Sequence, residues 1–235
     1  MNVKNVGIKQ PLHPAPLWKE PNEIVQMAHS SLLVAQPEGI NATTLAEIIQ
    51  VTYKTAWAIL QKIRLAMHET DEHSLLSGKI RANSAIYGKP YNSSIRKHPQ
   101  EHLFTIAASQ DSINYSQQIK LKIIPTAHLQ QGLILKNEIE DFKSKHIATY
   151  SDDVQYVTGR YSPERFHDLL QIANQACKWL NNTYHGLGKK YLQLYMDEFS
   201  YRYNHYLNNS KSMLLQLTQL CLSKLRLNYS FIEAI

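Results

Sequence analysis

The sequence predicts an α/β protein in which an N-terminal helix-turn-helix is followed by a mixed sheet flanked by helices. Three observations predict this class. Apolar residues recur at helical spacing up to about residue 68, three strand-like segments follow between residues 79 and 125, and the spacing is helical again after residue 162. A chain of 235 residues suits one or two domains. We expect a helix-turn-helix region at 1–75 and an α/β domain at 76–235.

The first region is predicted to contain three helices, at 22–35, 43–50 and 53–68. Thr44, with Glu47 three residues later, has the pattern of a capping box, and Thr52 is a suitable cap for the third helix. The third helix has the clearest amphipathic pattern, because its apolar residues recur every three or four positions. The residues expected on its buried face are Ala56, Ile59, Leu60, Ile63 and Met67.

The second region begins with strands. Their predicted ranges are 79–87, 102–109 and 118–125, and the third alternates polar and apolar residues as a half-exposed strand does. A charged helix at 137–145 and a fourth strand at 146–150 follow, the strand ending at Ser151, Asp152 and Asp153. The remaining helices are predicted at about 162–182, 189–207 and 211–226.

Composition narrows the classes of function. A net charge of +6 suits a polyanionic partner such as nucleic acid without requiring one. The two cysteines are far apart in the sequence, which argues against a disulfide framework and favours a reducing, cytoplasmic setting. The first residues lack the apolar stretch of a signal peptide, and no apolar run approaches the roughly 20 residues that span a bilayer. We therefore expect no membrane partner.

The helix at 53–68 is the expected recognition helix. In a helix-turn-helix, the N-terminal residues of this helix lie in the major groove, which would place Tyr53, Lys54 and Thr55 there. Lys62 and Arg64 are expected to reach phosphates. The alternative is an ordinary three-helix bundle with solvated lysines.

Three stretches carry a resemblance to a known family. Residues 51–57 read VTYKTAW, and the C-terminal region contains KWLNNTYHGL at 178–187 and YMDEFSYRYN at 195–204. Together they resemble the ISXO-like family of insertion-sequence transposases. The resemblance implies a helix-turn-helix that binds terminal inverted repeats of duplex DNA, a possible homo-oligomer, and an RNase H-like domain that cleaves and transfers DNA strands. Such chemistry uses two Mg²⁺ ions held by carboxylates.

The resemblance also places the expected acidic cluster. Asn83 stands where the first acid of the family should be, and Asp152 matches the second acid at the end of the fourth strand. The third acid has no clear match. Glu198 is a candidate metal ligand, although an ion pair with Arg202 four residues later on the same helix face is at least as plausible. Lys178 is the expected phosphate-binding residue of the catalytic region.

The residue at position 83 determines whether full catalytic activity is expected. A neutral amide offers Mg²⁺ one carbonyl oxygen and no negative charge, so metal binding should be weakened severely. The sequence therefore predicts Mg²⁺-dependent DNA transposition by Asp152 and Glu198 that is impaired at Asn83. The alternative is a non-catalytic DNA-binding protein, either a transposase remnant or a repressor. A protein-interaction bundle without a DNA role is the third class.

Overall fold

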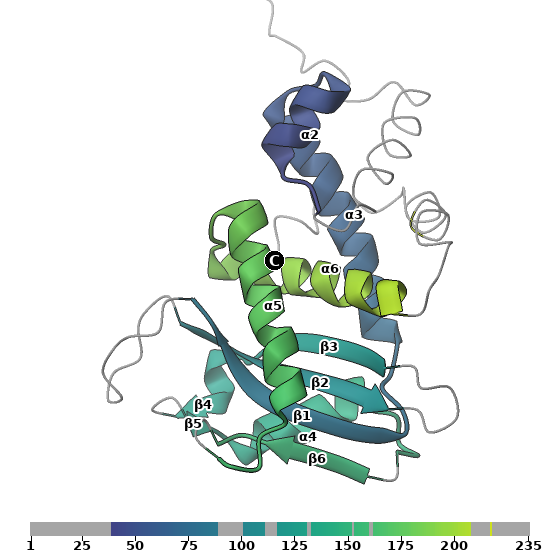
Figure 1. The fold of residues 1–235 in the computed structure, drawn as a ribbon, viewed down its shortest axis with the longest axis vertical. Coiled ribbons are helices and arrows are strands. Elements are labelled where there is room, and N and C mark those ends of the chain that lie inside the picture. Colours follow the sequence, from purple (N-terminus) through teal and green to yellow (C-terminus); the bar gives the residue numbers. More distant parts are fainter. Residues whose placement is uncertain are drawn as a thin grey trace, which may run out of the picture.

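The computed structural model describes residues 39–88, 101–110, 117–130, 133–151, 153–159, 162–207 and Leu217. Within these ranges the protein is an α/β fold with a mixed sheet and helices packed against it (Figure 1). The helix predicted at 22–35 lies outside the described residues, as does the helix predicted at 211–226 apart from Leu217.

Two consecutive helices open the described chain, α2 (Ala42–Ile49) and α3 (Tyr53–His73). The side chain of Thr52 accepts a hydrogen bond from the Thr55 N–H at 3.2 Å, which confirms it as the cap of α3. The predicted cap of α2 was wrong. Asn41 occupies that position, and its Oδ1 accepts from the Thr44 N–H at 2.9 Å. Because either residue type can accept this bond, the sequence pattern alone did not distinguish them.

The main sheet contains four described strands in the order β3-β2-β1-β6. These are β1 (Lys79–Tyr87), β2 (His102–Gln110), β3 (Gln117–Ile123) and β6 (Asp153–Val157). The β1–β2 and β2–β3 pairs are antiparallel, whereas β1 and β6 are parallel. The first three strands match their predicted ranges closely. A short 3-10 helix, η1 (Thr126–His128), leads to a small hairpin of β4 (Leu129–Gln130) and β5 (Leu133–Ile134).

The predicted position of the fourth strand was wrong. His146 is the last residue of α4 (Lys136–His146), and Ile147 makes only an isolated parallel bridge with Leu76. The strand that pairs with β1 is β6, which starts at Asp153. A strand-like run of five residues is a weak signal. In a parallel pair, long-range pairing with the partner strand decides which segment becomes the strand.

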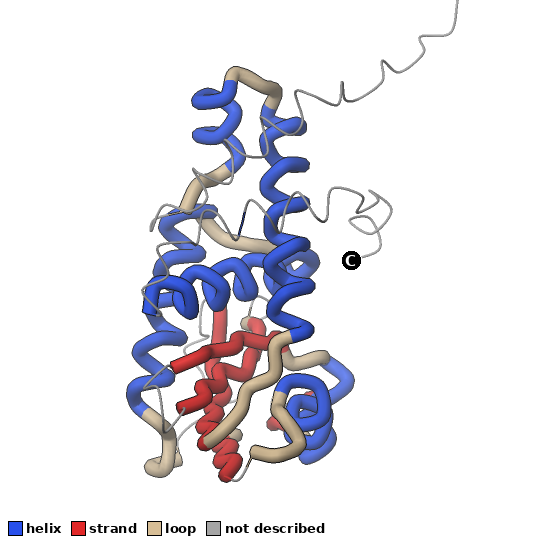
Figure 2. The backbone as a smooth tube through the Cα atoms, turned by 90° about the vertical axis from the view of Figure 1, so that its right-hand side faces the viewer, coloured by secondary structure: helices blue, strands red, loops and turns tan. Residues whose placement is uncertain are grey.

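The helices cover the sheet in layers (Figures 1 and 2). The apolar faces of α5 (His167–Tyr184) and α6 (Lys189–Leu207) share one core cluster with the sheet residues Phe104, Ile106 and Leu121. Phe142 of α4 instead joins Ile80 and Ala82 in a separate cluster. Because successive strand residues point to opposite faces, α4 and α5 lie on opposite faces of the sheet.

The two helices of the first region are packed onto this body through α6. The expected apolar residues of α3 are buried, and their cluster includes Tyr201 of α6. Two side-chain amides of α6 also hydrogen-bond to the edge of β3. The Gln193 side chain donates to the Leu121 carbonyl and accepts from the Ile123 N–H. The Asn204 side chain donates to the Ile119 carbonyl and accepts from the Ile119 N–H. These side-chain amides satisfy backbone N–H and C=O groups of β3 that would otherwise be available to another strand.

Candidate functional site

Asn83, at the expected position of the first catalytic acid, is fully buried in β1. Its Nδ2 donates to the Phe166 carbonyl at 2.7 Å, and its Oδ1 accepts from the Phe166 N–H at 3.3 Å. Phe166 is the residue that precedes the first turn of α5. The amide therefore uses one donor and one acceptor to fix the start of α5 on the sheet. An ionised carboxylate has no donor and could not form both bonds.

Two arginines and a serine make further contacts near this amide. Ser84 donates to the Thr158 carbonyl at 3.0 Å, and Arg165 donates to the Ser84 carbonyl. The Arg81 guanidinium lies 5.2 Å from the centre of the Phe166 ring. These two guanidinium groups, one at the Ser84 carbonyl and one over the Phe166 ring, would oppose a divalent cation nearby, because like charges repel.

The second expected acid, Asp152, lies outside the described residues. Its neighbour Asp153 is exposed and is the first residue of β6, where it pairs with Lys79. Asn83 pairs with Val157, four positions further along, which corresponds to about 13 Å of strand. Asp153 and Asn83 therefore lie at opposite ends of the β1–β6 pairing. The residues that follow β6, beside Asn83, are Thr158 and Gly159. Asp153 thus begins the strand that pairs with β1, whereas the sequence pattern predicts it at the end of the fourth strand.

Glu198 is the centre of a buried ion-pair cluster. One carboxylate oxygen lies 2.7 Å from Arg64 Nε of α3, and the other lies 2.7 Å from Arg202 Nη2. The Tyr184 hydroxyl also donates to this carboxylate at 3.2 Å. Burial alone would raise the pKa of Glu198, but the two guanidinium groups outweigh it and hold this pKa below its usual range. The ion pair with Arg202, one of the two expectations for Glu198, is confirmed.

Arg64 is not on the surface where a phosphate contact requires it. Its side chain is 2% exposed, and its guanidinium lies 4.0 Å from the centre of the Tyr195 ring. It cannot reach DNA in this conformation. Arg64 lies between buried Ile63 and Leu65 in the chain, but the partner that makes its burial possible is 134 residues away.

The remaining expected DNA-contacting residues are more accessible. Tyr53 is 58% exposed and Lys54 is exposed, both in the first turn of α3, whereas Thr55 and Lys62 are half-buried. Lys178 is exposed on α5. One turn beyond Tyr53, the Trp57 ring packs edge-on against Tyr191 of α6 at 5.7 Å. This contact places the beginning of α3 beside the beginning of α6.

The turn between α5 and α6 also lies close to α2. His185 ends α5 in the left-handed conformation, with φ of 56°, and its N–H donates to the Asn181 carbonyl. Asn41 Nδ2 reaches the Thr183 carbonyl at 3.5 Å. Gly39, with φ of 73°, lies against Trp179 so closely that a Cβ would be 2.9 Å from Cζ2 of the indole. The segment with the family resemblance therefore holds α2 and α3 onto the rest of the protein.

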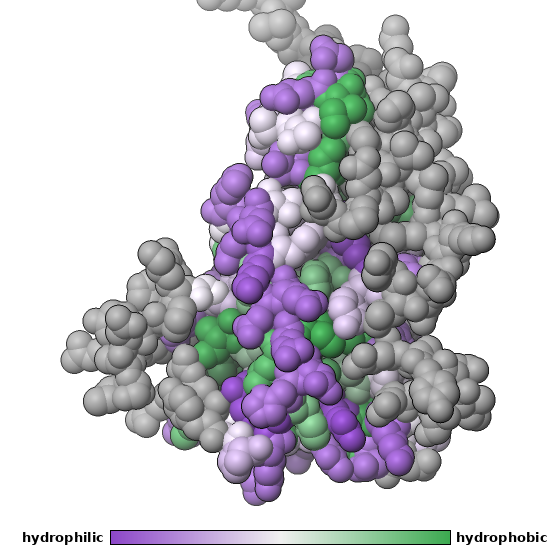
Figure 3. Space-filling model, viewed as in Figure 1, coloured by the Kyte–Doolittle hydropathy of each residue, from purple (hydrophilic) through white to green (hydrophobic). Residues whose placement is uncertain are grey.

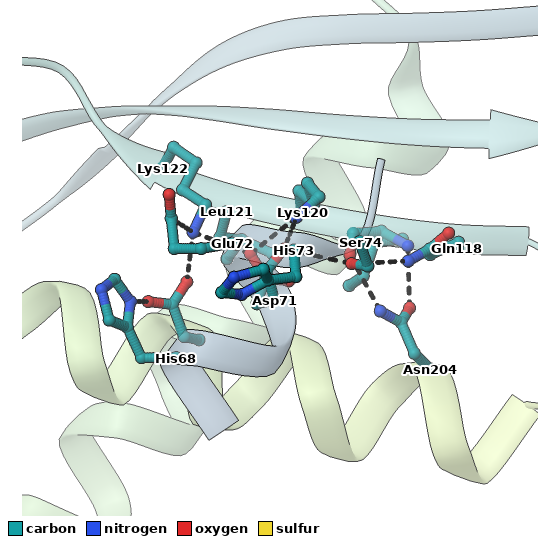
Figure 4. A network of polar contacts seen from close by, with 12 residues as sticks. His68, Asp71, Glu72, His73, Ser74, Gln118, Lys120, Leu121, Lys122 and Asn204 are labelled. Carbon is teal, nitrogen blue, oxygen red and sulfur yellow. Dashed lines mark hydrogen bonds and ion pairs between the residues drawn. The ribbon is translucent and has the colours of Figure 1, made fainter. Parts of the chain in front are cut away.

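A second polar network was missed by the sequence analysis (Figure 4). Lys122 of β3 lies 2.7 Å from Asp71 and 3.0 Å from Asp197, and Lys120 lies 2.9 Å from Asp71. His68 completes it through a 2.6 Å contact with Asp197. Burial opposes ionisation of Asp71 and Lys122, but their mutual attraction lowers the pKa of Asp71 and raises that of Lys122. The alternating lysines of β3 were the available signal, but they were read as solvent-facing.

One group of three side chains in the described part of the chain could hold a metal ion. The candidate ligand atoms of His128, Glu138 and Asp141 all lie within 4.8 Å of one another. His128 Nδ1 is already 2.6 Å from a Glu138 oxygen, and Lys145 lies 2.8 Å from Asp141. An imidazole with two carboxylates suits zinc better than Mg²⁺, which prefers oxygen ligands. The group lies on α4 and η1, on the face of the sheet opposite α5, so it does not supply the expected Mg²⁺ site.

None of the helices in the described ranges is long and apolar enough to cross a membrane. Comparisons with protein families, curated proteins and solved structures find no match for this chain.

Proposed function

We propose that this protein binds duplex DNA through the N-terminal end of α3 and does not cleave it. The observation that carries the proposal is a contrast between the expected DNA-contacting residues and the expected catalytic position. The first turn of α3 exposes Tyr53 and Lys54, whereas the amide of Asn83 is buried and occupied by backbone hydrogen bonds. Of the two functions that the sequence suggests, this contrast favours the non-catalytic one.

The geometry of α2 and α3 supports the DNA-binding half of the proposal. A three-residue connection joins α2 to a capped helix whose first turn faces solvent, as a recognition helix requires. The apolar face of α3 is buried in a cluster that includes Tyr201 of α6, and the helix is held by the Arg64–Glu198 ion pair. A recognition helix anchored in this way loses little conformational entropy when it binds. The net charge of +6 favours association with a polyanion.

The strand arrangement supports a relationship to transposases. The order β3-β2-β1-β6, with only the last pair parallel, is consistent with the first four strands of an RNase H-like sheet. We therefore infer an RNase H-like domain that retains the sheet without the acidic cluster. Duplex ends of an insertion sequence are the expected ligand, and Mg²⁺ is not required for their binding.

A binding and cleavage experiment tests both parts of the proposal, the DNA binding and the absence of cleavage. The protein is titrated into labelled duplex DNA at low salt with fluorescence anisotropy as the readout, and the same duplex is incubated with Mg²⁺ or Mn²⁺ and examined for cut strands. We expect binding without cutting. The Lys54→Gln variant should bind more weakly, whereas the matched Lys143→Gln variant on α4 should bind as the unmodified protein does. Absence of binding would refute the DNA half, and cutting by the unmodified protein would refute the non-catalytic half.

A further inference from the structure

The exposed face of α5 has an unusual composition. Its outward positions from residue 171 onward, with the residue that ends the helix, include amides, one lysine and one histidine: Gln171, Asn174, Gln175, Lys178, Asn182 and His185. We call this set the α5 strip. Surface helices normally mix both signs of charge, but the one exposed acid of α5 is Asp168, in the first turn. The opposite face of α5 is buried through Leu169, Ile172, Ala173, Ala176 and Leu180, so the strip is fixed in place by the core.

The strip continues across the turn into α6. Lys189 and Lys190, the first two residues of α6, are exposed. Figure 3 shows hydrophilic side chains forming a continuous column over α5 that rises toward the α5–α6 turn. The column is one surface, because residues three and four apart on a helix are neighbours.

Contacts between rings connect this surface to α3. The Lys190 ammonium lies 5.3 Å from the centre of the Tyr191 ring, and Tyr191 packs on Trp57 at 5.7 Å. Trp57 is one helical turn from Tyr53 and Lys54. The three exposed lysines of the strip and turn, Lys178, Lys189 and Lys190, therefore extend from the proposed recognition end of α3 to the C-terminal half of α5, and the amides of the strip continue along α5.

We propose that the α5 strip, with Lys189 and Lys190, binds the phosphate backbone of the same duplex that α3 contacts. This inference rests on the proposed function. Lysines neutralise phosphates, and Asn and Gln side chains donate hydrogen bonds to phosphate oxygens without reading the base sequence. From residue 171 to residue 185 the helix rises about 21 Å, which is more than half of the roughly 34 Å turn of a DNA duplex. The surface extends the contact with DNA beyond the site that a helix-turn-helix alone covers.

The test compares two triple variants that remove the same charge. One carries Lys178→Gln, Lys189→Gln and Lys190→Gln, and the other carries Lys136→Gln, Lys143→Gln and Lys145→Gln on exposed positions of α4. The dissociation constant is measured against salt concentration on a duplex of about three helical turns and on one of about one turn. Each lost phosphate contact should reduce the log–log salt slope by about 0.9.

We expect the α5–α6 variant to reduce the slope on the long duplex by about 2 to 3, and the α4 variant to leave it unchanged. On the short duplex the α5–α6 variant should have a smaller effect. If the unmodified protein binds but both triple variants keep its slope, the second surface is refuted while the proposed function stands. If the unmodified protein binds no duplex, the proposed function itself fails. An equal reduction of the salt slope in both variants would mean that the effect comes from net charge, and it would overturn the inference.

Discussion

Arg64 Nε lies 2.7 Å from a carboxylate oxygen of Glu198, although 134 positions separate these residues in the chain. The pair joins α3 to α6 in the interior, and Arg202 and Tyr184 complete it. The sequence predicts a phosphate contact for Arg64 and metal binding for Glu198. In the structure, the charges of these two side chains neutralise each other instead. Their contact also fixes the direction in which the first turn of α3 points.

Glu198→Gln should destabilise the protein by about 3 to 5 kcal/mol, because it leaves two guanidinium groups buried without their counter-charge. The free energy of unfolding is measured by urea denaturation. Glu140→Gln, on an exposed position of α4, is the control and should change it by less than about 0.5 kcal/mol. A Glu198 variant as stable as the control would show that the carboxylate does not anchor α3.

Asn83→Asp should lower the stability by about 1 to 3 kcal/mol, because the carboxylate cannot donate to the Phe166 carbonyl and one buried group loses its partner. It should not create Mg²⁺-dependent DNA cleavage. Unfolding by urea and strand cleavage are measured on the same preparation. Asn182→Asp makes the same chemical change on the exposed face of α5 and should be close to neutral. Cleavage by the Asn83 variant would show that a functional metal site needs only this one carboxylate.

The stability should depend on pH through His146. Its burial, followed by the positive charge of Lys122, lowers the pKa of His146 to about 4. Between the unfolded pKa near 6.5 and this value the unfolded chain binds the proton, so stability falls as the pH falls, by up to about 1.4 kcal/mol per unit. His146→Phe should flatten this part of the pH profile. The profile is measured as the free energy of unfolding from about pH 7 to pH 4.5.

His68 should act in the opposite direction. Burial disfavours its charged form, but the hydrogen bond to Asp197 outweighs burial and raises the pKa of His68. The contribution of His68 is therefore complete below the unfolded pKa and is lost as the pH rises through the folded one. His68→Gln should remove the gain in stability that occurs as the pH falls through the folded pKa toward about 6.5, and should leave the loss at lower pH unchanged. An unchanged slope above about pH 6.5 in the His68 variant would contradict the ion pair with Asp197.

Gly39→Ala should weaken the contact between the start of α2 and α5. The added Cβ would be 2.9 Å from Trp179 Cζ2, and φ of 73° is unfavourable for a side chain. A loss of about 1 to 3 kcal/mol is expected in urea unfolding. Gly186→Ala is the matched control, because its φ of 100° is also unfavourable for a side chain and nothing lies within 4 Å of its Cβ position. Equal effects of both substitutions would mean that the Trp179 contact contributes nothing.

The elements that depend on local signals were predicted well from the sequence. The periodic apolar face of α3 is buried as expected, Thr52 caps that helix, and β1 and α6 have their predicted bounds. These features follow from side-chain spacing and from hydrogen bonds within a few residues. The fourth strand was misplaced because its identity depends on pairing with β1, more than 70 residues earlier in the chain.

The candidate site depended more strongly on tertiary structure. The absence of an acid at position 83 is a property of the sequence, but the two hydrogen bonds that occupy Asn83 exist only because α5 returns to β1. Likewise, the lysines of β3 were expected in solvent, and they are buried because α3 and α6 bring Asp71 and Asp197 to them. Composition and periodicity determined which segments are helices or strands and which carry charge. The fold decided which charges are neutralised inside and which remain exposed, because burial of a charge depends on a partner that only long-range packing supplies.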